Sequence, residues 1–330
     1  MRTRRADETA NETASNEMTP NETTANEGDR PMTTRLTGRN ARRAARARWA
    51  TALLGAAGLL AVTACSDSEP TFLGKERITI AHKNDQPGTS YKPSYNYSGF
   101  DYLLGRRIVD ELGIKASRPV DVPSDERVTA VTENDADLVI ATFSITDERM
   151  KLIDFVGPYA VTYQGFLVGK DGGDIHTVED LHGRSVCTWK GTTSAEVLAR
   201  PAYEALETYE RDDASDCLDD IRKGRADAVS TDQLILYGFA GQYADEGLRV
   251  LPGETIGPPQ YYGIGMPKNH RADCRKLREI VKKYVGSSAW LADLKESLSL
   301  IPANEKNWQT QYRPSDAAID ARSCRDRTSP

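Results

Sequence analysis

The sequence predicts an α/β protein with parallel sheets and two similar lobes. From Arg77 onward, segments that read as strands alternate with segments of helical period, which is typical of parallel sheets connected by helices. One short pattern occurs twice, at residues 133–139 and 222–229: a helix ends, a turn follows, and Ala-Asp leads into an apolar strand. The length of 330 residues suits two domains with a sizeable core.

The elements are expected in the following order. Residues 77–81 read as a first strand, and the next helix, over 101–113, places Phe100, Leu104, Ile108 and Leu112 on one face. Further strands are expected over 137–142, 163–168, 185–188 and 226–230. A helix opens near Thr146, and others are expected over 193–206, 214–223, 233–242, 272–285 and 288–297.

Composition excludes several classes of protein. The chain is 38% hydrophobic and 28% charged, and only one apolar run approaches membrane length. Collagen-like, wholly disordered and polytopic membrane proteins are therefore excluded. The net charge of −6 argues against a nucleic-acid partner, because no excess of basic side chains offsets the repulsion by phosphate.

The N-terminal segment reads as a targeting signal rather than as part of the folded domain. Residues 1–31 repeat Asn-Glu-Thr and carry almost no large apolar side chains, which predicts a disordered extension. Residues 32–64 hold six Arg and no acid, and end in the apolar run Trp49–Ala64. These are the basic and hydrophobic regions of a secretory signal peptide.

The signal ends in Val62-Thr63-Ala64-Cys65, which resembles the lipobox of bacterial lipoproteins. The resemblance implies that Cys65 becomes a lipid-modified N-terminus and that residues 65–76 form a polar tether. We therefore expect an extracytoplasmic protein, anchored by lipid to the outer face of the cell membrane. A plain signal peptide followed by a stray cysteine is the alternative.

The four remaining cysteines predict two disulfides in an exported, oxidising setting. Three connectivities are possible, and we favour Cys187–Cys217 and Cys274–Cys324 because each pair lies within one region of the chain. The second bridge would pin an otherwise loose tail from Asn304 to Pro330. No Cys-x-x-Cys motif and no clustered histidines accompany the cysteines, so no metal is expected.

The usual catalytic signatures are missing from the sequence. It has no Gly-x-Ser-x-Gly elbow, no phosphate-binding Gly-rich loop and no His-Glu-x-x-His, and its four histidines are scattered. We therefore expect a protein that is not an enzyme and needs no cofactor.

The sequence instead indicates a ligand clamp at three places where strands end. Residues 142–149 and 190–194 are strand-to-helix junctions rich in hydroxyls and backbone N–H groups, which are donors for an anion. Arg149 offers a two-pronged bond to a carboxylate. Asp232 follows another strand and is suited to an ammonium group. Together these groups predict a zwitterionic ligand.

The segment Ile78–Leu298 resembles the family 3 extracellular solute-binding proteins of ABC transporters for polar amino acids. The matching stretches are residues 98–101, 137–149, 154–155, 157–159, 191–193 and 230–232. The resemblance implies a type II periplasmic-binding-protein-like fold, in which two hinge strands join two α/β lobes with parallel-dominated sheets. The implied boundaries are 77–161 and 263–300 for lobe 1, 162–262 for lobe 2, and 301–330 for a C-terminal tail.

The resemblance also implies roles for single residues. Arg149 would bind the ligand α-carboxylate, and Asp232 the α-ammonium. Lys83 would meet a side-chain carboxylate, since residues 83–88 and the Cys187/Cys217 pair resemble the glutamate-binding subgroup. The assisting residues at the two junctions are Thr142, Ser144, Thr192 and Thr193, and the aromatic neighbour of the ligand is one of Tyr91, Tyr95, Tyr97 and Phe143.

The expected function is that of a monomeric, lipid-anchored receptor for a polar amino acid, with glutamate as the first choice. It would deliver the ligand to an ABC permease and, through the permease, to its ATPase subunits. A glutamine- or aspartate-binding protein of the same family is an alternative. A lipoprotein that reports a ligand to a kinase is another, and a dehydratase on the same fold is the least favoured.

Overall fold

The structure is a computed structural model that describes residues 71–114 and 116–326. The chain divides into two compact units, Met1–Ala64 and Cys65–Pro330, and all described residues belong to the second. The predicted extension, signal peptide and lipidation site at Cys65 lie outside the described residues, as does the tether before residue 71.

A nine-stranded sheet forms the framework of the described chain, in the order β4-β1-β5-β11-β6-β9-β7-β8, with β10 also paired to β6. β1 pairs in parallel with β4 and β5, and β7 pairs in parallel with β8 and β9, whereas β6 and β11 are antiparallel to each other. A small hairpin, β2 (Asp85–Gln86) and β3 (Ser90–Tyr91), stands apart. The strands are β1 (Arg77–His82), β4 (Ala116–Asp121), β5 (Leu138–Val139), β6 (Asp154–Val168), β7 (Ser185–Trp189), β8 (Glu207–Arg211), β9 (Ala228–Asp232), β10 (Arg249–Val250) and β11 (Ile256–Met266).

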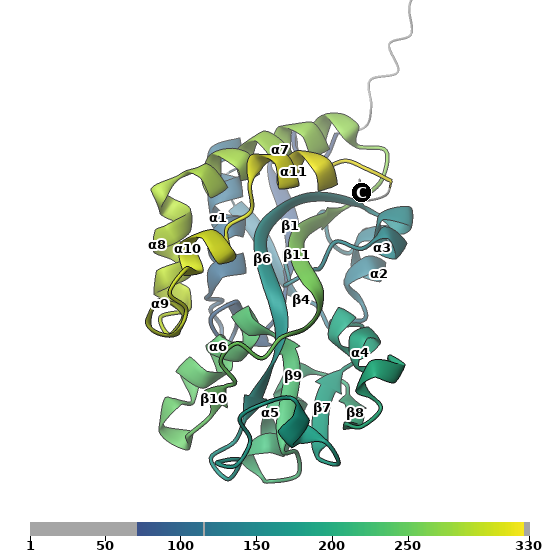
Figure 1. Cartoon of the computed structure of the whole chain (residues 1–330). Coiled ribbons are helices and arrows are strands. Elements are labelled where there is room, and N and C mark those ends of the chain that lie inside the picture. Colours follow the sequence, from purple (N-terminus) through teal and green to yellow (C-terminus); the bar gives the residue numbers. More distant parts are fainter. Residues whose placement is uncertain (1–70, 115, 327–330) are drawn as a thin grey trace, which may run out of the picture. The chain divides into compact units, whose positions relative to one another are not determined.

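This topology confirms a type II two-lobed α/β fold. We call residues 77–161 and 263–300 the first lobe and residues 162–262 the second lobe. The long strands β6 and β11 run from one lobe into the other, and Val161 and Thr162 of β6 pair with Tyr261 and Gln260 of β11 (Figure 1). A single continuous sheet therefore joins the two parallel halves.

The helices of the first lobe are α1 (Phe100–Leu112), α2 (Arg127–Thr132), α3 (Asp147–Leu152), α7 (Arg271–Gly286) and α8 (Ser288–Ser297); those of the second are α4 (Thr193–Leu198), α5 (Ala214–Arg222) and α6 (Gln233–Gln242). The helix expected over 193–206 is wrong in length. It ends at Leu198, and Pro201 begins a separate turn, because proline forces the preceding Arg200 into an extended conformation. The strand expected over 137–142 shortens to β5, since the chain turns sharply at Thr142.

The repeated Ala-Asp pattern corresponds to one interaction made twice. In the first lobe, Asp137 donates its N–H to the carbonyl of Thr79 (2.9 Å) and accepts the N–H of Thr79 on its carboxylate (2.8 Å). In the second lobe, Asp227 makes the same two bonds to Ser185, both at 2.9 Å. Each aspartate thus fixes the strand that follows it against a parallel neighbour, β1 in the first lobe and β7 in the second.

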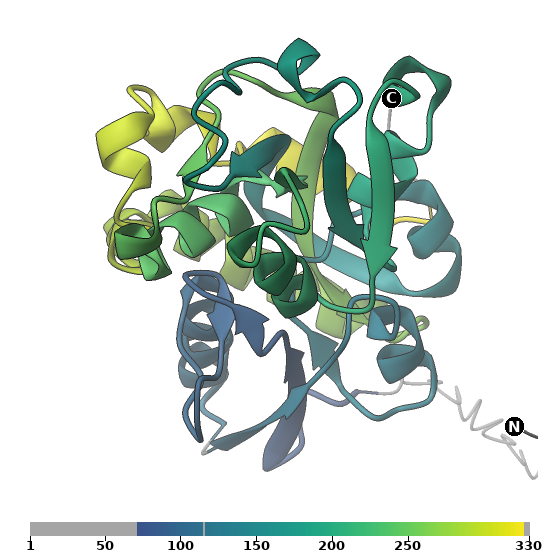
Figure 2. The same ribbon diagram turned by 90° about the horizontal axis from the view of Figure 1, so that it is seen from below.

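The described part of the C-terminal segment, up to residue 326, is folded against the first lobe by its own packing as well as by the expected bridge. It forms α9 (Ile301–Asn304), α10 (Trp308–Gln311) and α11 (Asp316–Arg322), and Tyr312 and Ile319 are fully buried. Burial of these apolar side chains against α7 and α8 gives the segment its order. Figures 1 and 2 show it, in yellow, beside these helices.

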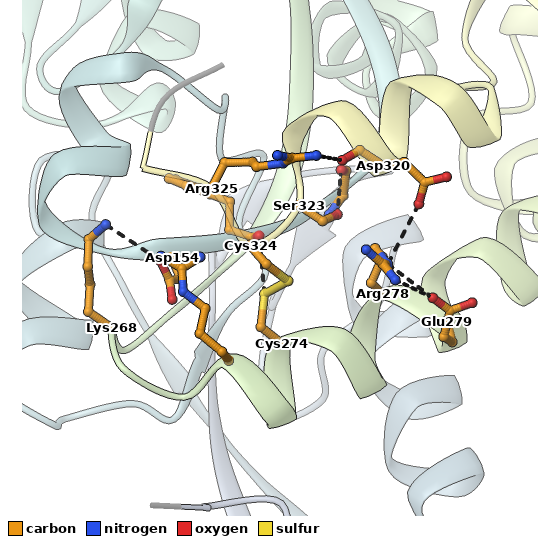
Figure 3. Close-up of a disulfide and its surroundings, with 12 residues drawn as sticks. Asp154, Lys268, Cys274, Arg278, Glu279, Asp320, Ser323, Cys324 and Arg325 are labelled. Atoms are coloured by element: carbon orange, nitrogen blue, oxygen red, sulfur yellow. Dashed lines mark hydrogen bonds and ion pairs between the residues drawn. A yellow bond between two sulfur atoms is a disulfide. The ribbon is translucent and has the colours of Figure 1, made fainter. Parts of the chain in front are cut away.

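Both expected disulfides are confirmed. Cys187–Cys217 ties β7 to α5, and Cys274–Cys324 ties α7 to the residues after α11 (Figure 3). Next to the second bridge, the Ser323 hydroxyl accepts the N–H of Gly157 and donates to the carbonyl of the same residue. The C-terminal segment is therefore attached to β6 as well as to α7.

Candidate functional site

A polar cavity lies between the two lobes. Five of the seven predicted ligand-binding residues line it, although they come from both lobes and from distant parts of the sequence. The lining consists of Gln86, Ser124, Arg127, Thr142 and Ser144 from the first lobe, and Trp189, Thr192, Thr193, Ser194, Thr231, Asp232 and Ile235 from the second.

Thr142 is held in a strained conformation that brings its segment into the cavity. Its φ is +46°, which is costly for a β-branched residue, by about 1–3 kcal/mol. Its N–H donates to Asp101 Oδ2 (2.7 Å), and its hydroxyl donates to Gln86 Oε1 (2.9 Å). Beyond the turn, the carbonyl of Phe143 accepts the N–H of Gly263 on β11. These bonds fix the direction in which residues 142–144 leave the sheet.

Arg149 lies beside the cavity and bridges the lobes. It is the third residue of α3, and its own backbone N–H donates to the Thr146 hydroxyl that caps the helix (3.3 Å). Its Nη1 donates to the carbonyl of Ser144 (2.8 Å) and its Nη2 to the carbonyl of Gly191 in the second lobe (2.9 Å). Since a guanidinium has five N–H donors, these bonds leave donors for a ligand.

Arg127, which the sequence analysis did not select, is a second cation at the same place. Its Nε and Nη1 donate to the carbonyls of Ser124, Ala141 and Thr142, and its Nη2 donates to the carbonyl of Gly191 (2.9 Å). Burial, and then the like charge of Arg149, lower the pKa of Arg127 to about 9. It therefore stays cationic at neutral pH.

The two guanidiniums share one aromatic support and find no acid at salt-bridge distance. They lie 4.6 Å (Arg127) and 5.0 Å (Arg149) from the centroid of the Phe143 ring. Within the described part of the chain, neither makes an ion pair shorter than 4.0 Å with a carboxylate. Arg127 lines the cavity, whereas Arg149 lies beside it, where the charges of Glu196 and Asp232 act on its guanidinium from a longer distance.

Asp232 supplies one negative charge to the cavity. Its Oδ2 accepts the O–H of Tyr262 (2.7 Å), whereas its buried Oδ1 has no hydrogen-bond partner in the described chain. Burial raises the pKa of Asp232 to about 6, and the Tyr262 hydrogen bond and the charge of Arg127 limit the rise. An oxygen in this state is suited to accept a hydrogen bond from an ammonium group.

The second-lobe side of the cavity is the loop from Trp189 to Thr193. The Thr192 hydroxyl caps α4 by accepting the N–H of Ala195 (3.1 Å), and Thr193 Oγ1 lies 3.5 Å from Ser144 Oγ of the first lobe. Just before these two threonines, Gly191 has a φ of +70°, and a Cβ on it would lie 2.4 Å from the backbone of Asp125. Glycine is needed here because the lobes touch at this point.

Lys83 does not line the cavity. Its Nζ lies 3.0 Å from Asp213 Oδ1 and 3.4 Å from Asp85 Oδ1. A bond from Lys83 to a ligand carboxylate therefore stays a prediction. Of the aromatic candidates, Phe143 lies beneath the arginines, and none of the four lines the cavity. The lining aromatic is Trp189, whose Nε1 donates to Ser124 Oγ (3.3 Å).

Seven of the twelve lining residues were not predicted: Gln86, Ser124, Arg127, Trp189, Ser194, Thr231 and Ile235. Ser194 and Thr231 are direct neighbours of predicted residues. Gln86 lies in the stretch 83–88, which resembles the glutamate-binding subgroup. Its place in that stretch was the signal that could have identified Gln86 as a cavity residue. Arg127 follows Asp125 and Glu126 and reads as part of a solvated charged run. Only its burial, which depends on the turn at Ser124, distinguishes it.

The fold and the site together define a two-lobed α/β binding protein with a polar cavity between its lobes. Comparison with known proteins makes this more specific. Residues 78–309 match the bacterial extracellular solute-binding proteins, family 3, and the chain belongs to that family.

Similar proteins include two named glutamate-binding and one named glutamine-binding. The glutamate-binding protein of Corynebacterium glutamicum is 31% identical over 75% of this chain and 89% of its own. The glutamate-binding protein of Corynebacterium efficiens is 30% identical over 72% and 86%. The ABC transporter glutamine-binding protein of Bacillus subtilis is 30% identical over 66% and 79%.

Solved structures agree on the fold. An ancestral arginine-binding protein bound to arginine has a TM-score of 0.61 at 26% identity and covers 68% of this chain and 98% of its own. The solute receptor for L-cysteine of Neisseria gonorrhoeae has a TM-score of 0.64 at 21% identity, covering 74% and 98%. Among residues 71–326, no helix is long and apolar enough to cross a membrane, and no cluster of side chains is arranged to hold a metal ion.

Proposed function

We propose that the protein is a receptor for an acidic amino acid, with L-glutamate as the first choice, and that it delivers the ligand to an ABC importer. The observation that carries the proposal is the charge of the site. Two guanidiniums, Arg127 and Arg149, lie beside the cavity with no acid at salt-bridge distance in the described chain, and Asp232 has one unpaired oxygen.

A ligand with two carboxylates and one ammonium group complements this charge. The α-carboxylate pairs with Arg149, helped by the hydroxyls of Ser144 and Thr193, and the ammonium pairs with Asp232. Arg127 supplies the cation for the second carboxylate. Glutamine lacks the second carboxylate, and arginine carries a guanidinium that Arg127 would repel. Glutamate is therefore favoured over glutamine and arginine. The glutamate-binding relatives support the same choice.

Binding is coupled to contact between the lobes, because the cavity takes residues from both. A ligand held by Arg149 in the first lobe and Asp232 in the second adds bonds that exist only when the lobes meet. The ligand-bound form then docks on the permease. We propose a lipid on Cys65 as the membrane anchor. The receptor itself performs no chemistry, since ATP hydrolysis belongs to the transporter.

Calorimetric titration with glutamate, aspartate, glutamine, asparagine and arginine tests the proposal. We expect glutamate to bind at micromolar concentration or below, and to be recovered chemically unchanged. Tighter binding of glutamine would assign the protein to the other ligand of its relatives. Conversion of the ligand would show an enzyme, and no binding of any of the five would overturn the proposal.

A further inference from the structure

We propose that Lys83 and Asp85 of the first lobe, with Asp213 and Ser215 of the second, form a latch that holds the lobes together. The latch would set the affinity and residence time of the ligand without contacting it. This inference rests on the proposed function only in that a ligand occupies the cavity between the lobes.

The latch consists of two polar contacts of opposite sense. Lys83 Nζ of the first lobe lies 3.0 Å from Asp213 Oδ1, at the start of α5 in the second lobe. Asp85 Oδ2 of the first lobe accepts the N–H of Ser215 (3.2 Å), in the first turn of the same helix. The first lobe thus offers a cation to an acid and an acid to a helix N-terminus, and both contacts are electrostatically favourable.

Lys83 is buried, and both contacts across the lobes exist only while the lobes are closed. The Lys83 side chain is only 1% exposed, and a buried ammonium group needs ionic or hydrogen-bonding partners. Asp85 Oδ1, 3.4 Å away, belongs to the same lobe and stays with Lys83 when the lobes part. Asp213 and Ser215 belong to the other lobe and do not. Opening therefore exchanges both cross-lobe contacts for water.

The neighbouring residues show that the segment 85–87 packs closely against the second lobe. Gly238 of α6 faces Pro87, and a Cβ on Gly238 would lie 1.8 Å from the Pro87 carbonyl oxygen. Gln86, between Asp85 and Pro87, lines the cavity and accepts the Thr142 hydroxyl. One short stretch thus places a single residue in the cavity and its neighbours against α5 and α6. The latch is next to the ligand site but separate from it.

The test compares Lys83→Met, Asp213→Asn and the double variant of the full chain, by titration and stopped-flow dissociation of glutamate and glutamine. Asparagine also caps helices well, so Asp213→Asn removes the charge and keeps the start of α5. Asp216→Asn is the matched control, because Asp216 caps the same helix through the N–H of Asp213. We expect each single variant to lose affinity about three- to tenfold, equally for both ligands and mainly through faster dissociation.

The double variant distinguishes the latch from its alternative. The latch predicts that the double variant loses little more than either single one, because both remove the same contact. A loss in Lys83→Met that is confined to glutamate, with Asp213→Asn unchanged, would show that Lys83 binds the ligand and would overturn the latch. Affinities equal to wild type in all variants would also overturn it.

A ligand-free measurement separates the latch from the proposed function. If none of the amino acids binds the wild-type chain, the proposed function fails, and X-ray scattering of the ligand-free protein decides the latch alone. A larger radius of gyration for Lys83→Met than for wild type supports it. Identical scattering profiles overturn it.

Discussion

At the scale of single residues, the site is a small set of buried charges whose balance depends on the ligand. Arg127 and Arg149 share the face of Phe143, and Asp232 lies across the cavity with one oxygen unpaired. Without a ligand, these buried charges lack partners and lower the stability of the folded protein. A ligand of complementary charge supplies the partners and is bound favourably. Substitutions at these three positions should therefore separate ligand binding from stability.

Arg149→Ala should weaken glutamate binding by at least about 2 kcal/mol, since a carboxylate held between the lobes loses its charged partner. Calorimetric titration measures the loss. The unfolding temperature of the ligand-free variant is measured beside it, because Arg149 also donates to the carbonyls of Ser144 and Gly191. An unchanged affinity would remove Arg149 from the site.

Arg127→Gln should reduce the preference for glutamate over glutamine. The second carboxylate loses its cation, whereas an amide loses only a hydrogen bond, so the ratio of the two dissociation constants should move toward one. Arg127 also holds three carbonyls of its own lobe, and some loss of stability is expected. The ratio of affinities is therefore the informative measurement. Parallel losses for the two ligands would assign Arg127 a structural role alone.

Asp232 should make both stability and binding depend on pH. Its pKa rises from 3.8 to about 6 on folding, so between these values the folded, ligand-free protein binds more protons than the unfolded chain. Its contribution to stability is therefore present below about pH 4 and is lost as the pH rises through 6. Asp232→Asn should stabilise the ligand-free protein at pH 8, by up to about 3 kcal/mol, and not at pH 4.

The same titration acts on binding with the opposite sign. In the proposed complex the ligand ammonium pairs with the charged carboxylate of Asp232, so the affinity of wild type for glutamate should fall as the pH drops below about 6. Denaturation and titration at pH 4, 6 and 8 check both effects. A pH-independent difference in stability between wild type and Asp232→Asn would contradict this account.

At the scale of elements, the two disulfides should have different consequences. Cys274–Cys324 closes 50 residues and fixes the C-terminal segment to the first lobe, whereas Cys187–Cys217 holds α5, whose N-terminus meets Lys83 and Asp85. Replacing either pair by alanine should lower the free energy of unfolding by about 2–4 kcal/mol. Only loss of Cys187–Cys217 should also weaken ligand binding, which denaturation and titration of the two variants would show.

Elements with a clear local signal were predicted from the sequence. Helix α6 was placed at its observed bounds, 233–242, and α8 at 288–297. In α6 the signal is a continuous apolar run, which the structure buries over residues 233–240. β4 carries Arg118-Pro119 and β8 is mostly charged, so neither reads as a strand. Pairing with β1 and β7 makes them strands, and such long-range contacts are not visible locally. For β11, the family resemblance indicated a hinge strand near residues 260–265, whereas the two prolines at its start hide it from local patterns.

The site shows the same division between local and long-range signals. Thr142, Ser144, Thr193 and Asp232 stand where strands end and were found for that reason. Arg127 was missed because its role depends on burial between the lobes. Lys83 was selected by resemblance, and its partner Asp213 comes from a helix 130 residues away.

At the scale of the whole molecule, the proposed function makes ligand binding depend on contact between the lobes. Gly238 lies in the middle of α6 and faces Pro87 of the first lobe, where a Cβ would lie 1.8 Å from the carbonyl oxygen. Gly238→Ala should therefore obstruct closure and weaken ligand binding at least about tenfold. The substitution should leave α6 intact, since alanine favours helices.

Gly241→Ala is the matched control on the same helix. A Cβ on Gly241 would have 3.8 Å to its nearest neighbour, so the variant should bind ligand like wild type. Titration with glutamate compares the two variants, and circular dichroism confirms that both are folded. Equal affinities would show that the lobes do not meet at Gly238 in the ligand-bound protein.

The crystal structure of the glutamate complex tests the central claim most directly. We predict the ligand in the cavity between the lobes, its α-carboxylate bonded to Arg149, its ammonium to Asp232 Oδ1 and its side-chain carboxylate to Arg127, with Lys83 still paired to Asp213. A ligand whose side chain reaches Lys83, with Arg127 bonded only to protein carbonyls, would contradict the account of both the site and the latch.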